Sequence, residues 1–454
     1  MAKHGNQHAK EAGHSRRTHL KKSALSLSAA ALGTAAFRSL SARAHAAGRE
    51  TLKVALLGCG GRGAGAVTQA LSTEGPVVLW AMADAFPGRI ETAYEQLTTG
   101  QDARYDREAH EGYAGRINVP PERRFTGVHA YRDAIDSGVD VVLCASPPYF
   151  RPHHFEYAVE KGKHLFVEKP LATDAPGIRR ILAANEKAQE KNLKIVVGLQ
   201  RHHHAAYQET IRRIHEGAVG EILYLRCYWN QGSIWTFPRT PEMSELDYQL
   251  ANWQYFTWNG GDHIVEQHIH NLDVCNWVKG EHPVEAVGMG GRQVRLGPEH
   301  GQIYDHHAVE FTYADGTKLF SQCRQISGCW NSMTEYVHGT QGLAEVHAAR
   351  IEGAHPWRFR GSVPNPYQAS HDLLFAAIRN DTPRNEVPYA AENTMTAILG
   401  RMATYSGQRI TWDEALASDL DLGAGVLAAE PRPPVEPGRD GEYPVAMPGI
   451  TEVL

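Results

Sequence analysis

The stretch from Leu52 to Gly63 reads LKVALLGCGGRG, an apolar run that passes directly into a glycine-rich turn. The run suits a parallel strand buried on both faces, and the residues that follow, Ala64 to Leu71, continue as a helix. Glycines here admit a tight bend and let amide groups at the helix N-terminus approach a pyrophosphate. This order predicts a dinucleotide site whose turn comprises Gly58, Gly60, Gly61, Arg62 and Gly63.

A second apolar run, Val77 to Ala83, ends at Asp84. A carboxylate at this strand end can accept both ribose hydroxyls of adenosine and would repel a 2′-phosphate, so we expect NAD rather than NADP. The alternative for Asp84 is an ordinary helix cap. For Arg62, the alternatives are a phosphate contact and a solvated loop arginine.

Strand-like and helix-like segments alternate from residue 51 to about residue 200, which predicts a parallel sheet with helices packed on it. Ser146 and Pro147 form a turn directly after one of these strands, at the carboxyl edge where such sheets hold ligands. We therefore expect both residues beside the cofactor. The further strands are expected at 139–144, 164–167 and 194–198.

The chain begins with the elements of a twin-arginine export signal. Arg16 and Arg17 lie in a basic segment, followed by a mildly apolar run from Ser23 to Phe37 and a small-x-small site at Ala44-His45-Ala46. The run is too short for a membrane span, which needs about 20 predominantly apolar residues. We expect residues 1–46 to be a signal peptide of a periplasmic or secreted protein. The alternative is a disordered basic tail on a cytoplasmic protein.

Export has a consequence for the cofactor. Nicotinamide nucleotides are cytoplasmic, so an exported protein that uses one must fold around it first and keep it. Twin-arginine export moves folded proteins, which suits a preloaded cofactor. Such a protein is expected to regenerate its nucleotide within each turnover.

Composition narrows the partners. The 454-residue chain has a formal net charge of −5 and no basic block behind the signal, which argues against nucleic acid or an anionic membrane. Its six cysteines are scattered without CxxC spacing, and several lie in strand-like runs. Buried free thiols are therefore expected rather than a disulfide framework.

Residues 162–172, GKHLFVEKPLA, resemble the GKHV-x-x-EKP signature of the glucose–fructose oxidoreductase/inositol dehydrogenase (Gfo/Idh/MocA) family. The glycine turn, Asp84, the Ser146-Pro147 turn and the Gly198-Leu199-Gln200-Arg201 segment fall where that family has their counterparts. The resemblance covers residues 51 to about 420.

This resemblance implies that Lys169 is a catalytic lysine between nicotinamide and substrate hydroxyl. It also implies that Glu168 and Lys169 contact the cofactor. The family often has a histidine where this chain has Arg151, and His153 and His154 follow just beyond. Which of these side chains touches the nicotinamide ribose is left open.

Residues 260–273, GGDHIVEQHIHNLD, resemble the family's glycine-rich turn and the Asp-x-Gly-x-His-x-x-Asp that opens a helix. The alignment places Glu266 at the aspartate, His268 at the glycine and His270 at the histidine. On one helix Glu266 and His270 share a face, and a carboxylate beside an imidazole fixes its orientation and raises its basicity. We expect Lys169, His270 and Glu266 to be catalytic.

The substitution of His268 for glycine adds a bulky titratable group near the pocket. We expect it to contact substrate together with Arg201, His263 and Trp253. An alternative is a divalent-metal site built from the histidines of this segment, Glu266 and the run His202-His203-His204. No HExxH and no cysteine-paired site supports that alternative, and we expect no metal.

Period-2 patterns between residues 221 and 350 predict an open, mainly antiparallel sheet, as in the family's C-terminal domain. The strands are expected at 222–229, 284–294, 308–313, 318–325 and 335–338. Helices at about 367–379 and 390–407 are expected to pack against the nucleotide domain. In the family the exposed face of the sheet is a common oligomer interface, so a homodimer or homotetramer is expected.

An insertion from Gln231 to Asn259 is rich in aromatic side chains. Aromatic faces against sugar rings, with polar groups on the hydroxyls, are a usual way to hold carbohydrate. The alternative is that the aromatics form the insertion's own core. They are Trp235, Phe237, Tyr248, Trp253, Tyr255, Phe256 and Trp258.

The expected class is α/β. A Rossmann dinucleotide-binding domain (47–200) precedes an α+β substrate and oligomerisation domain (201–420) and a Pro-rich tail (421–454). The expected activity is oxidation of a sugar, polyol or glycoside hydroxyl in a redox-neutral cycle with tightly bound NAD, NADP being disfavoured. Lys169 or His270 takes the hydroxyl proton while hydride passes to nicotinamide. The alternatives are an ordinary NAD-dependent sugar dehydrogenase, an NAD-dependent glycoside hydrolase and a nucleotide-loaded sugar-binding protein.

Overall fold

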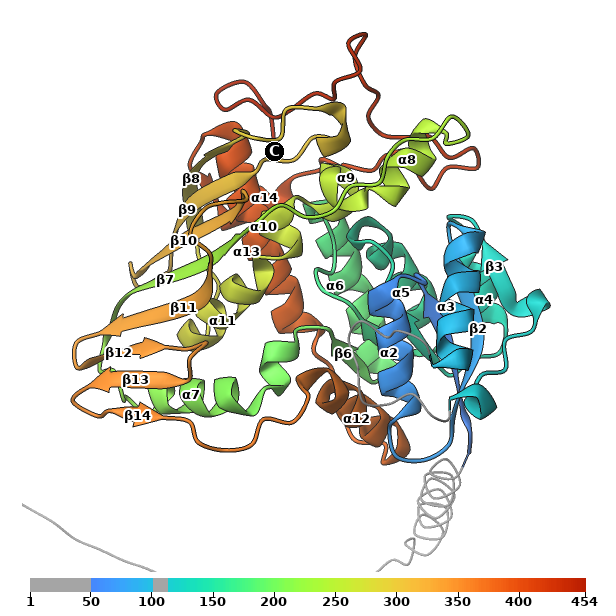
Figure 1. Cartoon of the computed structure of the whole chain (residues 1–454). Coiled ribbons are helices and arrows are strands. Elements are labelled where there is room, and N and C mark those ends of the chain that lie inside the picture. The colour runs from blue at the N-terminus through green and yellow to red at the C-terminus, as the bar shows by residue number, and fades with distance from the viewer. Residues whose placement is uncertain (1–49, 101–112) are drawn as a thin grey trace, which may run out of the picture. The chain divides into compact units, whose positions relative to one another are not determined.

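The computed structural model describes residues 50–100 and 113–454, and the export signal expected at 1–46 lies outside these ranges. No helix in the described ranges is long and apolar enough to cross a membrane. Two sheets, one at each side of the described chain, are separated by helices (Figure 1).

The first sheet is parallel and has six strands in the order β3-β2-β1-β4-β5-β6. Strands β2 and β3 follow β1 toward one edge of the sheet, and the chain then returns to the other side of β1 for β4, β5 and β6. The strand order therefore reverses between β1 and β4, which makes this the switch point of the sheet. The predicted strands are confirmed, whereas the short edge strand β3 was not predicted from the sequence. The strands are β1 (Leu52–Leu57), β2 (Val77–Asp84), β3 (Arg124–Thr126), β4 (Val141–Cys144), β5 (His164–Val167) and β6 (Ile195–Val197).

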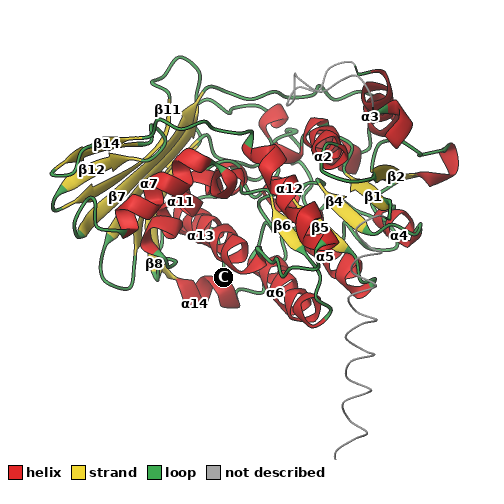
Figure 2. Cartoon of the chain, turned by 90° about the horizontal axis from the view of Figure 1, so that it is seen from below, coloured by secondary structure: helices red, strands yellow, loops and turns green. Residues whose placement is uncertain are grey.

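Helices cover both faces of this sheet (Figure 2), which explains its unbroken apolar runs. In β1, Val54 and Leu56 pack into one apolar cluster, while Ala55 and Leu57 belong to the cluster on the other face. The helices of this half are α2 (Gly61–Leu71), α3 (Pro87–Thr99), α4 (Tyr131–Asp136), α5 (Arg151–Glu160) and α6 (Ala175–Glu190).

The second sheet has nine strands in the order β14-β13-β12-β11-β7-β10-β9-β8-β15. Only β7 and β10 pair in parallel, so the prediction of a mainly antiparallel sheet is confirmed. The strands are β7 (Ile222–Gln231), β8 (Glu285–Gly291), β9 (His306–Thr312), β10 (Lys318–Gln325), β11 (Ser332–Gly339), β12 (Gly342–Glu345), β13 (Arg350–Gly353), β14 (Trp357–Arg358) and β15 (Ile410–Thr411).

The long helix α13 (Val387–Ser406) is buried along most of its length and contacts α6 and β6 on one side and β8 and β9 on the other. It therefore joins the two halves. The other face of the second sheet presents the exposed apolar side chains Val287, Met289 and Phe320. The remaining α-helices are α7 (Ala205–His215), α8 (Glu245–Ala251), α9 (Thr257–Gly260), α10 (His263–Glu266), α11 (Ile269–Lys279), α12 (Pro366–Arg379) and α14 (Trp412–Ala417).

Candidate active site

The glycine turn after β1 is packed tightly against the neighbouring β4 turn. Gly58 has φ of +90°, and a Cβ there would lie 2.6 Å from the backbone nitrogen of Ser146. A Cβ on Gly63 would lie 2.0 Å from the carbonyl oxygen of Gly58, whereas one on Gly60 would meet no atom within 4 Å. The turn thus has no room for a side chain at Gly58 or Gly63, whereas the space next to Gly60 is empty. The first amides of α2, from Gly61 onward, have no partner within the helix and suit a phosphate.

Asp84 lies at the end of β2, directly beside this turn. Its Oδ2 accepts a hydrogen bond from the Cys59 amide (2.7 Å) and its Oδ1 accepts one from the Phe86 amide (2.9 Å). Burial raises the pKa of Asp84. The two amide bonds fix the carboxylate, and each oxygen keeps a further lone pair for a ribose hydroxyl.

Four of the residues expected to bind cofactor line one open cavity: Gly58, Asp84, Ser146 and Pro147. Arg89, in the first turn of α3, lines the same cavity and was missed by the sequence reasoning. Its only sequence signal is its place five residues after Asp84.

Arg62 and Glu168 form an ion pair, with Arg62 Nε 2.7 Å from Glu168 Oε1. Arg62 also donates to Gln69 Oε1 at 2.7 Å. A Cβ on Gly198 would lie 2.5 Å from Glu168 Oε2, so the glycine leaves space for this carboxylate. Arg62 is therefore not a freely solvated arginine, because it links the glycine turn to the end of β5. Its Nη1 has no hydrogen-bond partner in the described ranges, and its contact with a phosphate stays a prediction.

Arg151 is a buried cation at the start of α5. Its Nε donates to the carbonyl of Ser146 (2.8 Å) and its Nη1 to the carbonyl of Pro170 (2.5 Å). Burial lowers the pKa of Arg151, while Glu168 acts in the opposite direction. Arg151 thus ties together the two turns that follow β4 and β5.

His154 is directed at the Ser146 hydroxyl, 2.9 Å from Nδ1. Burial, then the charges of His153 and Arg151, lowers the pKa of His154 to about 3. The imidazole is consequently neutral at physiological pH and positions Ser146 in the cavity wall. His153 lies against the ring of Tyr149, with centroids 5.7 Å apart.

Lys169 reaches from the end of β5 to the second half of the chain. Its Nζ donates to the Glu266 carbonyl at 2.6 Å and to Glu266 Oε1 at 2.8 Å. Both side chains are 13% exposed, so this ion pair is largely shielded from water but remains accessible to a small molecule at the surface. The catalytic lysine implied by the resemblance is thus held at the carboxyl edge of the sheet.

His270 is buried next to this pair. Burial, followed by the positive charges of Lys169 and Arg201, holds the pKa of His270 well below its ordinary value. Within the described ranges its Nδ1 has no hydrogen-bond partner, and its ring stacks on Trp229 with centroids 5.8 Å apart. A neutral imidazole with an unpaired nitrogen can accept a proton.

Two family models match this chain. Residues 52–199 match the oxidoreductase family with an NAD-binding Rossmann fold, and residues 207–345 match the GFO/IDH/MocA C-terminal domain. The chain belongs to the Gfo/Idh/MocA oxidoreductases. Its parallel sheet is accordingly the NAD-binding domain of that family.

Inositol 2-dehydrogenase of Pseudomonas fluorescens is 33% identical over 171 residues, which are 37% of this chain and 44% of that protein. Inositol 2-dehydrogenase/D-chiro-inositol 3-dehydrogenase of Lactiplantibacillus plantarum is 23% identical over 77% of this chain and 91% of its own length. 2,7-Anhydro-N-acetylneuraminate hydratase of Escherichia coli is 24% identical over 48% of this chain and 54% of that protein. The aldose-aldose oxidoreductase of Caulobacter crescentus has the same fold, with a TM-score of 0.60 at 18% identity, covering 80% of this chain and 100% of that one.

The family's second signature folds differently from the expected single helix. Helix α10 ends at Glu266 and α11 begins at Ile269, and the His270 amide donates to the Gln267 carbonyl at 3.3 Å. The Glu266 carbonyl is therefore released from helical pairing and accepts from Lys169 instead. The prediction that the Glu266 carboxylate orients His270 is wrong, because its only side-chain partner in the described ranges is Lys169.

Two of the expected substrate contacts belong to the protein core. His268 has no exposed surface, and its Nε2 lies 2.7 Å from Ser321 Oγ and 3.6 Å from Cys227 Sγ. His263 Nδ1 lies 2.8 Å from Asp262 Oδ1, and burial lowers the pKa of His263 to about 4. The predictions that His263 and His268 bind substrate are wrong, because both side chains are buried against the second sheet. His268 follows the helix break and contacts β7 and β10, and His263, at the start of α10, lies against His307 of β9 with ring centroids 4.9 Å apart.

Arg201 is buried and contacts the backbone of His270. It forms an ion pair with the fully buried Glu335 and donates to the His270 carbonyl at 3.0 Å. Arg201 therefore positions His270 through Nη1, and its contact with substrate stays a prediction. Glu335 and Asn271, which donates to it at 2.5 Å, were missed because they are far apart in sequence. Trp253, in a 3-10 turn and partly exposed, stays a predicted substrate contact.

The histidines weighed as metal ligands do not meet. His202 Nε2 lies 2.8 Å from Asp273 Oδ1 and His203 Nε2 lies 3.4 Å from Glu386 Oε1, so each has its own carboxylate. In the described ranges a different group, Asp262, His263 and His307, has potential ligand atoms within 4.8 Å of one another.

The Asp262 carboxylate in that group is already engaged. Its Oδ2 accepts from the Tyr304 amide at 3.0 Å and from the Tyr405 hydroxyl at 2.6 Å, and its Oδ1 from His263. The Asp262 carboxylate is thus fully used in hydrogen bonds, whereas Nε2 of His263 and Nε2 of His307 have no hydrogen-bond partner among the described residues.

The aromatic insertion is mostly core. Tyr248, Tyr255, Phe256 and Trp258 are buried, whereas Trp235 and Phe237 are exposed, with ring centroids 4.8 Å apart. The alternative of an internal core therefore holds for the four buried rings.

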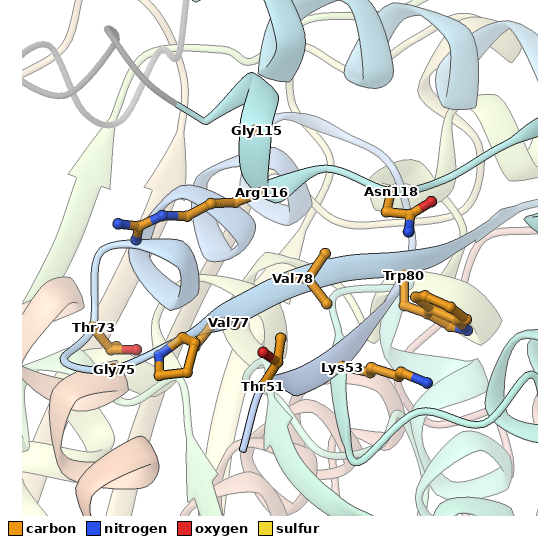
Figure 3. A pocket seen from close by; sticks show the side chains of 11 residues that line it. Thr51, Lys53, Thr73, Gly75, Val77, Val78, Trp80, Gly115, Arg116 and Asn118 are labelled. Carbon is orange, nitrogen blue, oxygen red and sulfur yellow. The ribbon is translucent and has the colours of Figure 1, made fainter. Parts of the chain in front are cut away.

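A separate surface hollow lies at the amino ends of β1 and β2 (Figure 3). Lys53 and Trp80 line it, with the ammonium 4.1 Å from the indole centroid. Gly58 and Asp84 lie at the opposite ends of the same strands. The hollow is therefore not part of the cofactor edge.

Proposed function

We propose that this protein is an exported oxidoreductase that acts on a hydroxyl of a sugar, polyol or glycoside and keeps its NAD through a redox-neutral cycle. The observation that carries the proposal is the Lys169–Glu266 pair beside neutral His270, at the edge that also holds Gly58 and Asp84. Bound NAD supplies the hydride acceptor and donor.

The residues of the chain divide the remaining work. Asp84 holds the adenosine ribose, and the first amides of α2 hold the pyrophosphate. The Lys169 ammonium stabilises the alkoxide that develops as the hydroxyl loses its proton, while His270 accepts that proton. Glu266 holds the ammonium in place at 2.8 Å.

The relatives support the substrate class, and one of them supports a reaction without net oxidation. Two are inositol dehydrogenases, which act on a polyol, and one is a hydratase, which adds water without net redox change. The hydratase also favours a second candidate, cleavage of a glycosidic bond after transient oxidation of a neighbouring carbon. Export is supported by the order of signal elements in residues 1–46. The apolar outer face of the nine-stranded sheet supports a homodimer or homotetramer.

The test begins with protein purified from the cell envelope without dialysis. We expect nucleotide released by denaturation to have the mass of NAD at about one per chain. Incubation with a panel of sugars, inositols and glycosides should then yield product over many turnovers without added NAD. An empty protein that turns over only with added NAD would establish the ordinary dehydrogenase. Export is tested by fusing residues 1–46 to a reporter, with Arg16→Lys/Arg17→Lys as control.

A further inference from the structure

The insertion (231–259) and the C-terminal segment 419–446 meet beside the nucleotide cavity. We propose that together they form a cap that belongs to the nucleotide site and retains bound NAD, an inference that rests on the proposed function. In Figure 1 the C-terminal segment, in red, runs along α8 and α9.

The insertion supplies a wall of the cavity. Leu250, near the end of α8, lines the same cavity as Asp84 and Ser146. Phe86 and Val128, from the nucleotide domain, complete the apolar side of this wall and pack against the same cluster as Leu250. The adenosine end of the site is therefore closed by a side chain from outside the nucleotide domain.

One aromatic core holds the insertion against the nucleotide domain. Tyr149 and Phe150, which follow the β4 turn, pack edge-to-face on Trp258 with centroids 5.5 and 6.2 Å apart. The same core contains Val426 and Tyr443 of the C-terminal segment. Opening the cavity at Leu250 would expose this core to water, at a cost of roughly 25 cal/mol for each Å² of apolar surface.

The C-terminal segment is fixed to the nucleotide domain at two points. The Leu422 amide donates to Asp174 Oδ2 at 3.1 Å, and the Ala428 carbonyl lies 3.1 Å from Nε2 of His129, next to Val128. A Cβ on Gly423 would lie 2.2 Å from the ring of Tyr149, which shows how closely the segment follows that ring.

The segment is also fixed to α8. The Tyr443 hydroxyl donates to Glu245 Oε1 at 2.5 Å, and Gln249 Nε2 donates to the Val435 carbonyl at 2.7 Å. Arg239 donates to both Glu245 and the Tyr443 oxygen. Helix α8 cannot move away from the C-terminal segment without breaking these bonds. We therefore expect the insertion and the C-terminal segment to open together when the nucleotide is released.

The test measures release of NADH from the intact protein, by the loss of its fluorescence after mixing with excess NAD⁺. We expect Leu250→Ala and Tyr443→Phe each to speed release at least tenfold, and the double variant to speed it further. Leu319→Ala, a fully buried leucine of β10, is the control for lost stability alone. Tyr336→Phe is the control for loss of a tyrosine–glutamate bond elsewhere, since Tyr336 donates to Glu345.

The outcomes separate the two proposals. If the unaltered protein holds NAD and both cap variants release NADH at its rate, the cap is wrong and the proposed function stands. If Leu319→Ala speeds release as much as Leu250→Ala does, and Tyr443→Phe leaves it unchanged, the cap is also wrong. If the unaltered protein contains no nucleotide and takes up no NADH, both proposals fail.

Discussion

The carboxyl edge of the parallel sheet and the histidine-rich segment 262–270 are both dense in titratable side chains, yet they use them differently. At the sheet edge, Asp84 ends β2 and lines the cavity, and Lys169, two residues after β5, forms a partly exposed ion pair with Glu266. In the histidine-rich segment, His263 and His268 point into the second sheet. The carboxyl ends of parallel strands always lie at the same edge of the sheet. The direction in which a helical side chain points depends instead on where the helix begins and ends.

The strongest way to test the sheet edge is to remove its cation. Lys169→Ala should fold and retain NAD but lose about 10³-fold or more in kcat/KM, because it removes the stabilising charge at the developing alkoxide. Steady-state turnover of the best substrate and the mass of bound nucleotide measure the two effects. Lys191→Ala, on the surface, is the matched control. Near-full turnover of Lys169→Ala would refute the assigned role.

A pair of histidine variants tests the difference between the two regions directly. His270→Ala should lose about 10²-fold or more in turnover with little change in stability, because it removes a proton acceptor. His268→Ala should keep its turnover but lose about 1–3 kcal/mol of stability, because it removes the partner of buried Ser321. Turnover and denaturant unfolding measured on both variants decide the matter. The reverse pattern would return His268 to the substrate site.

The role of Glu266 is tested at the helix break between the two regions. Glu266→Gln should lower turnover by about 10-fold, less than Lys169→Ala, because the backbone carbonyl still holds the ammonium. A loss equal to that of Lys169→Ala would mean that the carboxylate itself takes part in proton transfer.

The relative affinity for NAD and NADP tests the role of Asp84 at the sheet edge. NAD should bind more tightly than NADP, and Asp84→Ala should narrow that ratio about 10-fold by removing repulsion of the 2′-phosphate. Arg89→Ala should widen the ratio in favour of NAD, since Arg89 lines the same cavity. Dissociation constants measured on protein freed of nucleotide test both. Equal affinities in the unaltered protein would contradict the role of Asp84.

Acid should destabilise the nucleotide domain through two buried histidines. His154 lies beside Ser146, and His371 of α12 lies on Phe166 of β5 with ring centroids 4.1 Å apart. Burial lowers the pKa of His154 and of His371 to about 3, so the folded state holds them neutral while the unfolded state protonates them below about 6.5. Their contribution is present above pH 6.5 and is lost progressively as pH falls toward 3. Between pH 6.5 and 5 each should cost about 1.5 kcal/mol. Denaturant unfolding of His154→Phe should show a shallower pH slope, and an unchanged slope would contradict the assignment.

The C-terminal half shows the limit of pattern reading on the fold. Strands β7 to β11 were predicted because apolar and polar residues alternate along the chain where buried and exposed positions alternate in the strand. The two-residue strands β14 and β15 were not predicted, because so short a segment has no period. Edge pairing alone gives them their conformation.

By itself the sequence determined the α/β class, the glycine turn, the place of Asp84 at the end of β2 and the position of Lys169 after β5. Each follows from local constraints: a residue that must lack a Cβ, an apolar run of fixed period, or a residue at a strand end. Only the tertiary structure decided the break after Glu266, the pair of Arg62 with Glu168, and the cap over the nucleotide cavity. The Arg62–Glu168 pair and the cap join segments distant in sequence, and the carbonyl freed at the break bonds to Lys169, 97 residues away. The residues next to each of these positions carry no signal of such contacts.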